Sequence, residues 1–406
     1  MSMRDCFKIA AAVAIAGPCL VLRVAHLHPS PAVAVAVFGA AVVAAAFLLA
    51  WAAWAAQVDI SASLATALLA LIAVLPEYAV DLYFAYAAGH RPDYAQYAAA
   101  NMTGSNRLLI GIGWPAVGLV FVWAMRRKRR FFAAIALESR RRVELAFLAI
   151  ASIYAVSIPI AGRISLIHAA VLLGLFGMYM WRSGQEERSE PELVGVAASI
   201  AHLSPTRRRV GVVALFVTAG VFVLAAAEPF ANALVATGRQ FGIDEFLLVQ
   251  WLAPLSSEAP ELIVASILAA RGQGTMALGT LLSSKVNHWT LLVGSLPVAY
   301  MVGGGSARGL VLDARQVEEF VLTAAQTLLG LSILLDLRFR ARESIVLFFL
   351  FAAQFLFPQQ SVRWVLSGIY LAVAITLLIL RRDQLLPTLK ALRHHREAAT
   401  MDAHSS

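Results

Sequence analysis

The sequence predicts an all-α, polytopic membrane protein of about twelve helices that contains an inverted internal repeat. Its composition, its regularly spaced apolar runs and two related internal segments support this prediction. Of 406 residues, 60% are hydrophobic and 14% are charged, and the mean hydropathy is +0.75. A soluble globular chain has roughly 45–50% apolar and about 25% charged residues. The excess apolar surface indicates that a lipid bilayer is the first partner of this chain.

The positive charge, a formal net +9, gathers in short arginine runs between apolar stretches. Such runs mark the cytoplasmic loops of membrane proteins. No basic domain with interleaved aromatic residues lies outside the apolar spans, so we expect no nucleic-acid partner. The two cysteines, Cys6 and Cys19, are too few for a disulfide scaffold. The arginine runs lie at 126–130, 140–142, 207–209 and 338–342.

Apolar runs of the ~20 residues that a helix needs to cross a bilayer recur along the chain. We expect the first run to stay as an uncleaved helix, because it lacks a small-residue cleavage site. An inside N-terminus places the arginine-rich loops and the tail 381–406 on one side, so both termini are expected in the cytoplasm. Abundant arginine and scarce lysine suggest the inner membrane of a bacterium. The spans lie near 7–26, 32–56, 60–88, 94–124, 143–161, 164–181, 211–237, 245–270, 275–302, 315–336, 343–357 and 362–380.

Two stretches, residues 71–114 and 254–297, resemble each other. Each has Pro-Glu inside an apolar span, then a short polar loop with glycine, then a cluster of small polar residues that opens the next span. The predicted topology puts loop 89–93 outside and loop 271–274 inside, so the two hairpins enter the membrane from opposite faces. Inverted repeats that meet at the midplane are an architecture of secondary transporters.

Each Pro-Glu pair predicts an oxygen-rich site inside the membrane. Pro76 and Pro260 each remove a helical hydrogen bond, which frees backbone carbonyls beside Glu77 and Glu261. In lipid, such irregular backbone survives only where it is buried in protein or lines a cavity. Carbonyl and carboxylate oxygens are suitable ligands for Na⁺ or Ca²⁺, and the carboxylates can also take up protons.

Other carboxylates share these helices. Asp81 follows Glu77 by four residues and Glu258 precedes Glu261 by three, so each pair projects from one helix face. Carboxylates within a membrane are costly to bury and generally mark a pathway. Glu228, beside a proline in the seventh span, has either an accessory or a structural role.

Small polar side chains occur at equivalent places in the two following spans. Asn101 and Ser105 share one helix face, as do Thr280 and Ser284. Such residues either coordinate ions or allow helices to approach closely and hydrogen-bond.

Three cationic or titratable side chains lie within the same spans. Lys285 is one of only four lysines, and we expect it to pair with Glu258 or Glu261. Its ammonium either occupies a cation site or forms a fixed structural ion pair. Arg107 poses the same question with a permanent charge. His288 is either a proton carrier or a hydrogen-bonded structural residue.

These residues resemble the cation/Ca²⁺ exchanger superfamily, which includes the Na⁺/Ca²⁺ exchangers. The two α-repeats of that family read roughly G-T-S-L-P-E and then G-N-x-x-G-S-N-x-x-N. The first repeat here has V-L-P-E at 74–77 and A-N-M-T-G-S-N at 100–106. The second has S-S-E-A-P-E at 256–261 and G-T-L-L-S-S-K at 279–285. The resemblance covers roughly residues 32–357.

The resemblance implies an antiporter with alternating access, whose ten core helices form a five-plus-five inverted repeat with an extra helix at each end. Glu77 and Glu261 would be the central carboxylate ligands of a metal cation. Asn101 and Thr280 would hold the paired ligand positions, and Asn106 would be the Asn of G-S-N. The implied segments are an extra N-terminal helix (1–31), a first repeat (32–181, α-repeat 60–124), a connecting loop (182–210), a second repeat (211–357, α-repeat 245–302) and an extra C-terminal helix with a basic tail (358–406).

The sequence also departs from the family pattern. Residues 72–74 replace Gly-Thr-Ser, Glu258 stands at a Ser position, and Lys285 replaces the second Asn. Four carboxylates against Lys285 and Arg107 give a formal charge of 2−, which leaves room for one divalent cation. Because hydroxyl ligands are lost and titratable groups are added, we favour H⁺ over Na⁺ as the coupling ion.

We therefore expect an antiporter that exports Ca²⁺ or another cation in exchange for H⁺ or Na⁺, with the transported cation as its ligand and no cofactor. The alternative is a degenerate family member that binds or senses cations without transport, with its site closed by ion pairs of Lys285 and Arg107. A membrane-embedded enzyme is disfavoured, because the sequence has no nucleophile–base pair, histidine metal cluster or phosphate-binding loop. The sequence leaves the oligomeric state open.

Overall fold

The computed structural model describes residues 1–59, 75–127, 134–185, 193, 195–356 and 359–392, and the part that it describes is almost entirely helical. Four two-residue strands form two small antiparallel pairs. Residues 72–74, the altered start of the first motif, lie outside the described residues. The α-helices are α1 (Met3–Val24), α2 (Pro31–Ala56), α4 (Leu75–Ala88), α5 (Ala95–Leu108), α6 (Trp114–Arg127), α7 (Arg142–Ala155), α8 (Ser157–Ala161), α9 (Leu166–Ser183), α10 (Gly195–Ala201), α11 (Pro205–Phe241), α12 (Glu245–Ala270), α13 (Gly274–Asn287), α14 (Val293–Val302), α15 (Ala314–Leu334), α16 (Ala341–Leu356), α17 (Gln360–Leu380) and α18 (Leu385–Lys390). The remaining elements are the 3₁₀ turns η1 (Pro92–Tyr94), η3 (Ser139–Arg141) and η5 (Arg382–Gln384), the π-helical segments η2 (Leu109–Gly113) and η4 (His288–Leu292), and the strands β1 (Ile135–Ala136), β2 (Arg163–Ile164), β3 (Leu310–Val311) and β4 (Arg338–Phe339).

Within the described residues, nine continuous helical segments have the length and apolar character to cross a membrane. The other three expected spans are not among these segments. Span 60–88 is described only from Leu75, span 275–302 is α13, η4 and α14 in succession, and α16 has 16 residues. Helix α11, with 37 residues, exceeds the expected 211–237. The short helix α10 within loop 182–210 was not predicted.

Local chemistry explains several helix ends. Pro205 lies in the first turn of α11. A backbone N–H at this position has no acceptor within the helix, so proline removes no helical hydrogen bond there. That helix ends at Gly242, whose φ of +64° suits glycine. At the start of α15, the Gln316 backbone N–H donates to Asp313 Oδ1 at 2.8 Å and the Asp313 N–H donates to Gln316 Oε1 at 3.2 Å. This reciprocal pair is a capping box.

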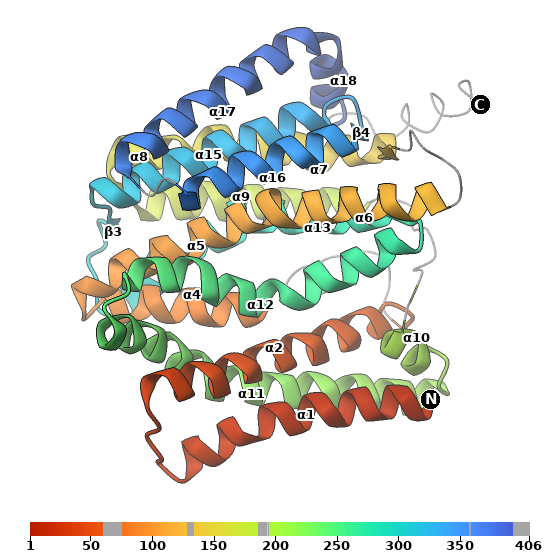
Figure 1. The fold of residues 1–406 in the computed structure, drawn as a ribbon, viewed down its shortest axis with the longest axis vertical. Helices are drawn as coiled ribbons and strands as arrows, with labels where there is room; N and C mark the ends of the chain where they lie inside the picture. The colour runs from red at the N-terminus through yellow and green to blue at the C-terminus, as the bar shows by residue number, and fades with distance from the viewer. Residues whose placement is uncertain (60–74, 128–133, 186–192, 194, 357–358, 393–406) are drawn as a thin grey trace. The chain divides into compact units, whose positions relative to one another are not determined.

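The chain folds into two compact units that each draw on both predicted repeats. Unit 1 comprises residues 1–101, 177–261 and 299–305, and unit 2 comprises 102–176, 262–298 and 306–406. In unit 1, α1, α2 and α11 lie side by side (Figure 1). In unit 2, α15 packs against α17 and α7, and α16 packs against α6 (Figure 1).

A side-chain hydrogen bond in unit 1 links the start of α12 to the first hairpin. The Tyr97 hydroxyl donates to Glu245 Oε2 at 2.8 Å, so α12 begins where the chain turns from α4 into α5. Helix α12 then continues for 26 residues before the next turn, at that helix's other end.

In unit 2, the strand pairing and the π-helical segments both reflect the internal repeat. Strand β1, after the first hairpin, pairs with β4, and β3, after the second hairpin, pairs with β2. The pairing is therefore reciprocal between the two repeats. The π-helical segments also begin at matching places, Leu109 three residues after Asn106 and His288 three residues after Lys285. A shared irregularity at the same offset supports the sequence comparison of the two segments.

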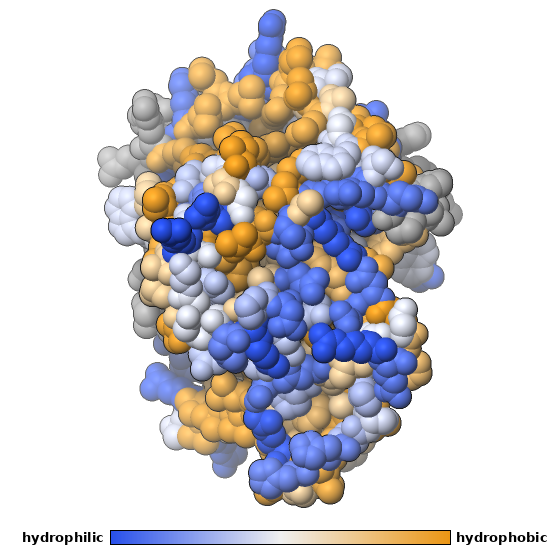
Figure 2. Space-filling model, turned by 90° about the vertical axis from the view of Figure 1, so that its left-hand side faces the viewer, coloured by the Kyte–Doolittle hydropathy of each residue, from blue (hydrophilic) through white to orange (hydrophobic). Residues whose placement is uncertain are grey.

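The surface agrees with a lipid environment. Large apolar side chains on the transmembrane helices are exposed, among them Leu224, Phe349 and Ile375. Figure 2 shows the face made by the helix ends on the left of Figure 1, where hydrophilic residues gather between apolar ones. A soluble protein rarely exposes so many apolar side chains along its helices.

Candidate ion-binding site

The carboxylates of unit 1 form a buried group. Glu77 and Asp81 come from α4, and Glu258 comes from α12, and each is less than 5% exposed. Carboxylate oxygens of Glu77 and Glu258 lie within 4.8 Å of each other. Glu77 and Asp81, one helical turn apart, also interact electrostatically. Three acidic groups from two helices, one of which contains internal prolines, therefore converge in one unit.

Such a group can hold either protons or a cation. Two ionised carboxylates at this separation repel each other strongly when they are removed from water, so a proton or a cation must compensate them. Oxygen atoms from several carboxylates are the ligands that Ca²⁺ prefers. Pro260 lacks an N–H, so the Ser256 carbonyl loses its helical partner, as expected from the sequence.

The structure places Glu261 and Asn101 in the same unit but in different environments. Asn101 is fully buried in α5. Glu261 is half-buried on α12, three residues beyond Glu258. The geometry thus joins Glu258, the residue at the family's Ser position, to Glu77, whereas the roles of Glu261 and Asn101 as ligands stay predictions.

Unit 2 contains the second half of the predicted residues, and two of them bind each other. Lys285 Nζ donates to the Asn106 backbone carbonyl and to Asn106 Oδ1, both at 2.7 Å. Lys285 is fully buried. Its expected pairing with Glu258 or Glu261 stays a prediction, because those carboxylates belong to unit 1.

The small polar residues of unit 2 are also held inside the protein. Ser105, Ser284 and His288 are buried, and Thr280 is half-buried. The Thr280 hydroxyl donates to the Met276 carbonyl at 3.1 Å within its own helix. That bond leaves the lone pairs of the Thr280 oxygen free to accept, so the choice between ligand and helix packing stays open there.

Arg107 has a different partner from the one assumed in the charge count. Its guanidinium forms an ion pair with Glu319 of α15 and donates to Gln354 Oε1 of α16 at 2.8 Å. Since Glu319 compensates Arg107, this arginine does not contribute to the formal charge of 2− that the sequence suggested. Glu319 and its neighbour Glu318 were not singled out from the sequence, although the rule for carboxylates inside spans would have identified both.

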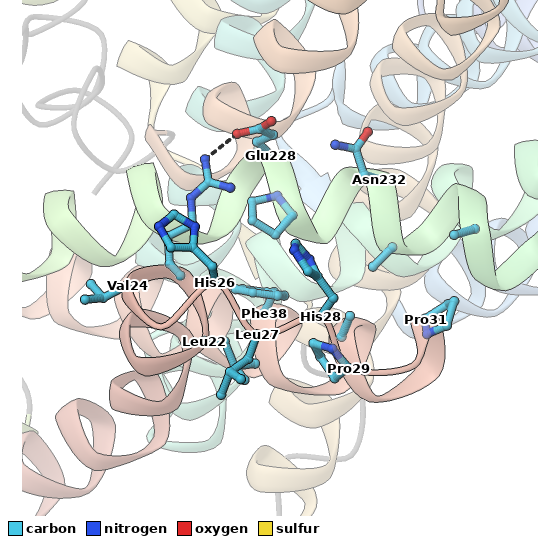
Figure 3. A pocket seen from close by; sticks show the side chains of 15 residues that line it. Leu22, Val24, His26, Leu27, His28, Pro29, Pro31, Phe38, Glu228 and Asn232 are labelled. Atoms are coloured by element: carbon cyan, nitrogen blue, oxygen red, sulfur yellow. Dashed lines mark hydrogen bonds and ion pairs between the residues drawn. The ribbon is translucent and has the colours of Figure 1, made fainter.

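Glu228 lies apart from the buried carboxylates, in a pocket of about 890 Å³ within unit 1. Its Oε2 accepts a hydrogen bond from Arg23 Nη2 of α1 at 2.5 Å (Figure 3). Both side chains are about half exposed. His26, His28 and Asn232 also line the pocket (Figure 3). The contact favours a structural role for Glu228, in which it ties α1 to α11.

Outside the spans, one ion pair has a clear electrostatic effect. Asp59, just after α2, accepts two hydrogen bonds of 2.7 Å from the Arg208 guanidinium at the start of α11. The Arg208 guanidinium, with a weaker contribution from Arg209, lowers the pKa of Asp59 from 3.8 to about 2. This ion pair joins the ends of two long helices of unit 1.

Comparison with known proteins identifies the family. The profile of the sodium/calcium exchanger protein family matches residues 30–184 and 211–359, which is most of the chain. The chain belongs to this exchanger family. The extra helices α1 and α17 lie outside the matched residues, as the predicted five-plus-five core with one added helix at each end requires.

Solved structures of exchangers support the assignment of this chain to the family. The H⁺/Ca²⁺ exchanger CAX is 40% identical, with a TM-score of 0.92, over 98% of this chain and 99% of that one. The Ca²⁺/H⁺ antiporter YfkE is 16% identical, with a TM-score of 0.61, over 91% of this chain and all of that one. The sodium-calcium exchanger NCX_Mj is 17% identical, with a TM-score of 0.51, over 79% and 96%. The chain thus has the inverted-repeat fold of these integral membrane antiporters. A search of curated protein sequences finds no match.

Proposed function

We propose that this exchanger moves Ca²⁺ across the membrane in exchange for H⁺. The observation that carries the proposal is the approach of the Glu77 and Glu258 carboxylates to within 4.8 Å, in a chain 40% identical to an H⁺/Ca²⁺ exchanger. Two buried carboxylates can be compensated by protons or by one divalent cation, but not by both at once. Competition at one site, combined with alternating access, couples the flow of one ion to the flow of the other.

In this proposal, the site residues have different roles in ion exchange. Glu77 and Glu258 bind the cation and release protons, and Asp81 adds a third carboxylate to the same buried group. Glu261 contributes an oxygen ligand from the next turn of α12, and Asn101 contributes one from α5. Arg107 is compensated by Glu319. The alternative of a site closed by ion pairs of Lys285 and Arg107 therefore loses one of its two cations.

We place the protein in the inner membrane of a bacterium, with both termini in the cytoplasm. The arginine-rich segments 140–142, 207–209 and 338–342 support this orientation, because positively charged loops are retained inside. The orientation can be tested by fusing a reporter enzyme that is active only in the cytoplasm after residue 406. This fusion should be active, and a fusion of a reporter that is active only in the periplasm should be inactive.

The functional test is Ca²⁺ uptake into proteoliposomes that contain the purified chain. Vesicles loaded at acidic pH and diluted into alkaline medium with Ca²⁺ should accumulate the ion, and a protonophore with a K⁺ ionophore should abolish the uptake. A matched set loaded with Na⁺ at equal pH should accumulate much less. Uptake driven equally well by the Na⁺ gradient would replace H⁺ with Na⁺ as the coupling ion, and no uptake under either gradient would refute the exchanger proposal.

A further inference from the structure

Unit 2 contains a buried charged cluster that the ion-exchange chemistry does not use. It consists of Arg107 on α5, Glu318 and Glu319 on α15, and Arg363 on α17. Glu318 and Glu319 are fully buried, and Arg107 is 1% exposed. Arg107 forms an ion pair with Glu319, and Arg363 Nε donates to Glu318. Arg363 Nε also lies 3.8 Å from Glu319 Oε1.

The cluster is electrically balanced, with two guanidinium groups and two carboxylates. Ions removed from water this completely persist only with close partners, and removal of one partner leaves an uncompensated buried charge. The two ion pairs differ in what they hold. The pair Arg363–Glu318 joins α17 to α15, whereas the pair Arg107–Glu319 joins α15 to α5, the helix that carries Asn106.

Residue 107 is attached to its neighbours through both its side chain and its backbone. The guanidinium donates to Gln354 Oε1 at 2.8 Å, and the backbone carbonyl of Arg107 accepts from Gln326 Nε2 at 3.4 Å. The next residue toward the N-terminus, Asn106, accepts two hydrogen bonds from Lys285. The end of α5 is therefore held between α13 on one side and α15 and α16 on the other.

The backbone at this point is also closely packed. The π-helical segment η2 starts at Leu109, two residues after Arg107. Within η2, a Cβ atom on Gly111 would lie 2.2 Å from the Phe351 ring of α16. The backbone therefore deviates from a regular α-helix soon after residue 107, and at Gly111 it leaves no room for a side chain.

We infer that Arg107 and Glu319 are positioning residues: their buried ion pair sets the place of Asn106, and thus of the Lys285 ammonium that Asn106 binds. The inference rests on the proposed ion exchange only for its transport readout. It assigns Arg107 a role outside the group of ion ligands. The neighbouring pair Arg363–Glu318 joins α17 to α15 and includes no residue of α5.

The experiment compares two charge-neutral double variants. Arg107→Met with Glu319→Gln removes the positioning pair, and Arg363→Met with Glu318→Gln removes the neighbouring buried pair of the same type. Ca²⁺ uptake is measured against Ca²⁺ concentration and pH in proteoliposomes. The first variant should raise the half-saturating Ca²⁺ concentration about fivefold or more, or shift the pH profile, and the second should leave both within about twofold of the wild type.

A third background separates positioning from general damage. If Arg107 and Glu319 act through Lys285, the Arg107→Met/Glu319→Gln change should add little to the effect of Lys285→Met. Hydrogen exchange of the amides of residues 102–108 provides a readout that needs no transport: it should accelerate in the Arg107→Met/Glu319→Gln variant and not in the other. Where that variant fails to fold, Gln354→Met takes its place in both measurements.

Three outcomes would overturn the inference: equal effects of the two double variants, additivity with Lys285→Met, or unchanged exchange of the α5 amides. An absence of Ca²⁺ uptake by the wild type would instead count against the proposed function. In that case, the hydrogen-exchange comparison still decides whether the Arg107–Glu319 pair holds α5.

Discussion

Lys285 donates two hydrogen bonds of 2.7 Å to one residue, Asn106, through the backbone carbonyl and the side-chain carbonyl together. The sequence comparison of the two repeats places these residues at equivalent positions. A π-helical segment follows each of them after the same number of residues. The two repeats thus contact each other at matching positions, where one has an amide and the other has an ammonium.

Loss of the Lys285 ammonium should impair both stability and transport. Lys285→Met leaves two buried carbonyl oxygens without their donor, at a cost of about 1–3 kcal/mol. We expect a lower melting temperature in detergent and about tenfold slower Ca²⁺ uptake. Lys390→Met is the matched control, because Lys390 is exposed on α18. Wild-type stability in the Lys285 variant would mean that the two hydrogen bonds contribute nothing.

The two carboxylates of the close pair, Glu77 and Glu258, should both be needed for Ca²⁺ uptake. Glu77→Gln and Glu258→Gln each remove one charge of the close pair, and each should reduce Ca²⁺ uptake about 100-fold or more. Glu138→Gln, at an exposed residue, is the control and should have no effect. If Glu261→Gln reduced Ca²⁺ uptake strongly and Glu258→Gln reduced it only slightly, the second ligand would be Glu261. The family motif, and not the observed pairing of Glu258 with Glu77, would then identify it.

The Asp59–Arg208 ion pair should make stability dependent on acidic pH. Arg208 lowers the pKa of Asp59 to about 2. A carboxylate whose pKa is lower in the folded state stabilises the fold above its unfolded value near 3.8, and this contribution disappears as the pH falls toward 2. Because water partly screens the pair, we expect a contribution of about 1 kcal/mol at neutral pH.

The comparison of wild type with Asp59→Asn measures this contribution. Melting temperatures in detergent should differ at pH 6, with the variant lower, and the difference should narrow steadily as the pH falls from 4 toward 2. A constant difference across this pH range would contradict the assignment to Asp59 ionisation.

The packing of α16 against η2 should tolerate no added methyl group. A Cβ atom at Gly111 would overlap the Phe351 ring at 2.2 Å, so Gly111→Ala should destabilise the protein by about 1–3 kcal/mol. Gly174→Ala in α9 is the matched control, since no atom lies within 4 Å of its added Cβ. The alanine there should be neutral or slightly stabilising. Equal melting temperatures for the two variants would mean that the Phe351 ring can move away.

Much of the architecture could be predicted because the bilayer limits the alternatives. Apolar runs long enough to span lipid, the arginine asymmetry and the duplicated Pro-Glu segments predicted a helical membrane protein of the exchanger fold. The irregular segments were harder to predict from the sequence. Neither the π-helical segments nor α10 produces a distinct pattern of apolar residues, and span 275–302 therefore looked like one regular helix.

The amino-acid sequence alone determined which carboxylates and small polar residues lie within spans, because lipid excludes them from every place except a functional or well-paired one. Their pairing was decided by tertiary structure. Helical periodicity relates Glu258 to Glu261 along α12, but only the packing of α12 and α4 in unit 1 brings Glu258 to Glu77. The partner of Arg107 lies 212 residues away on α15, and no local pattern links residues so distant in the chain.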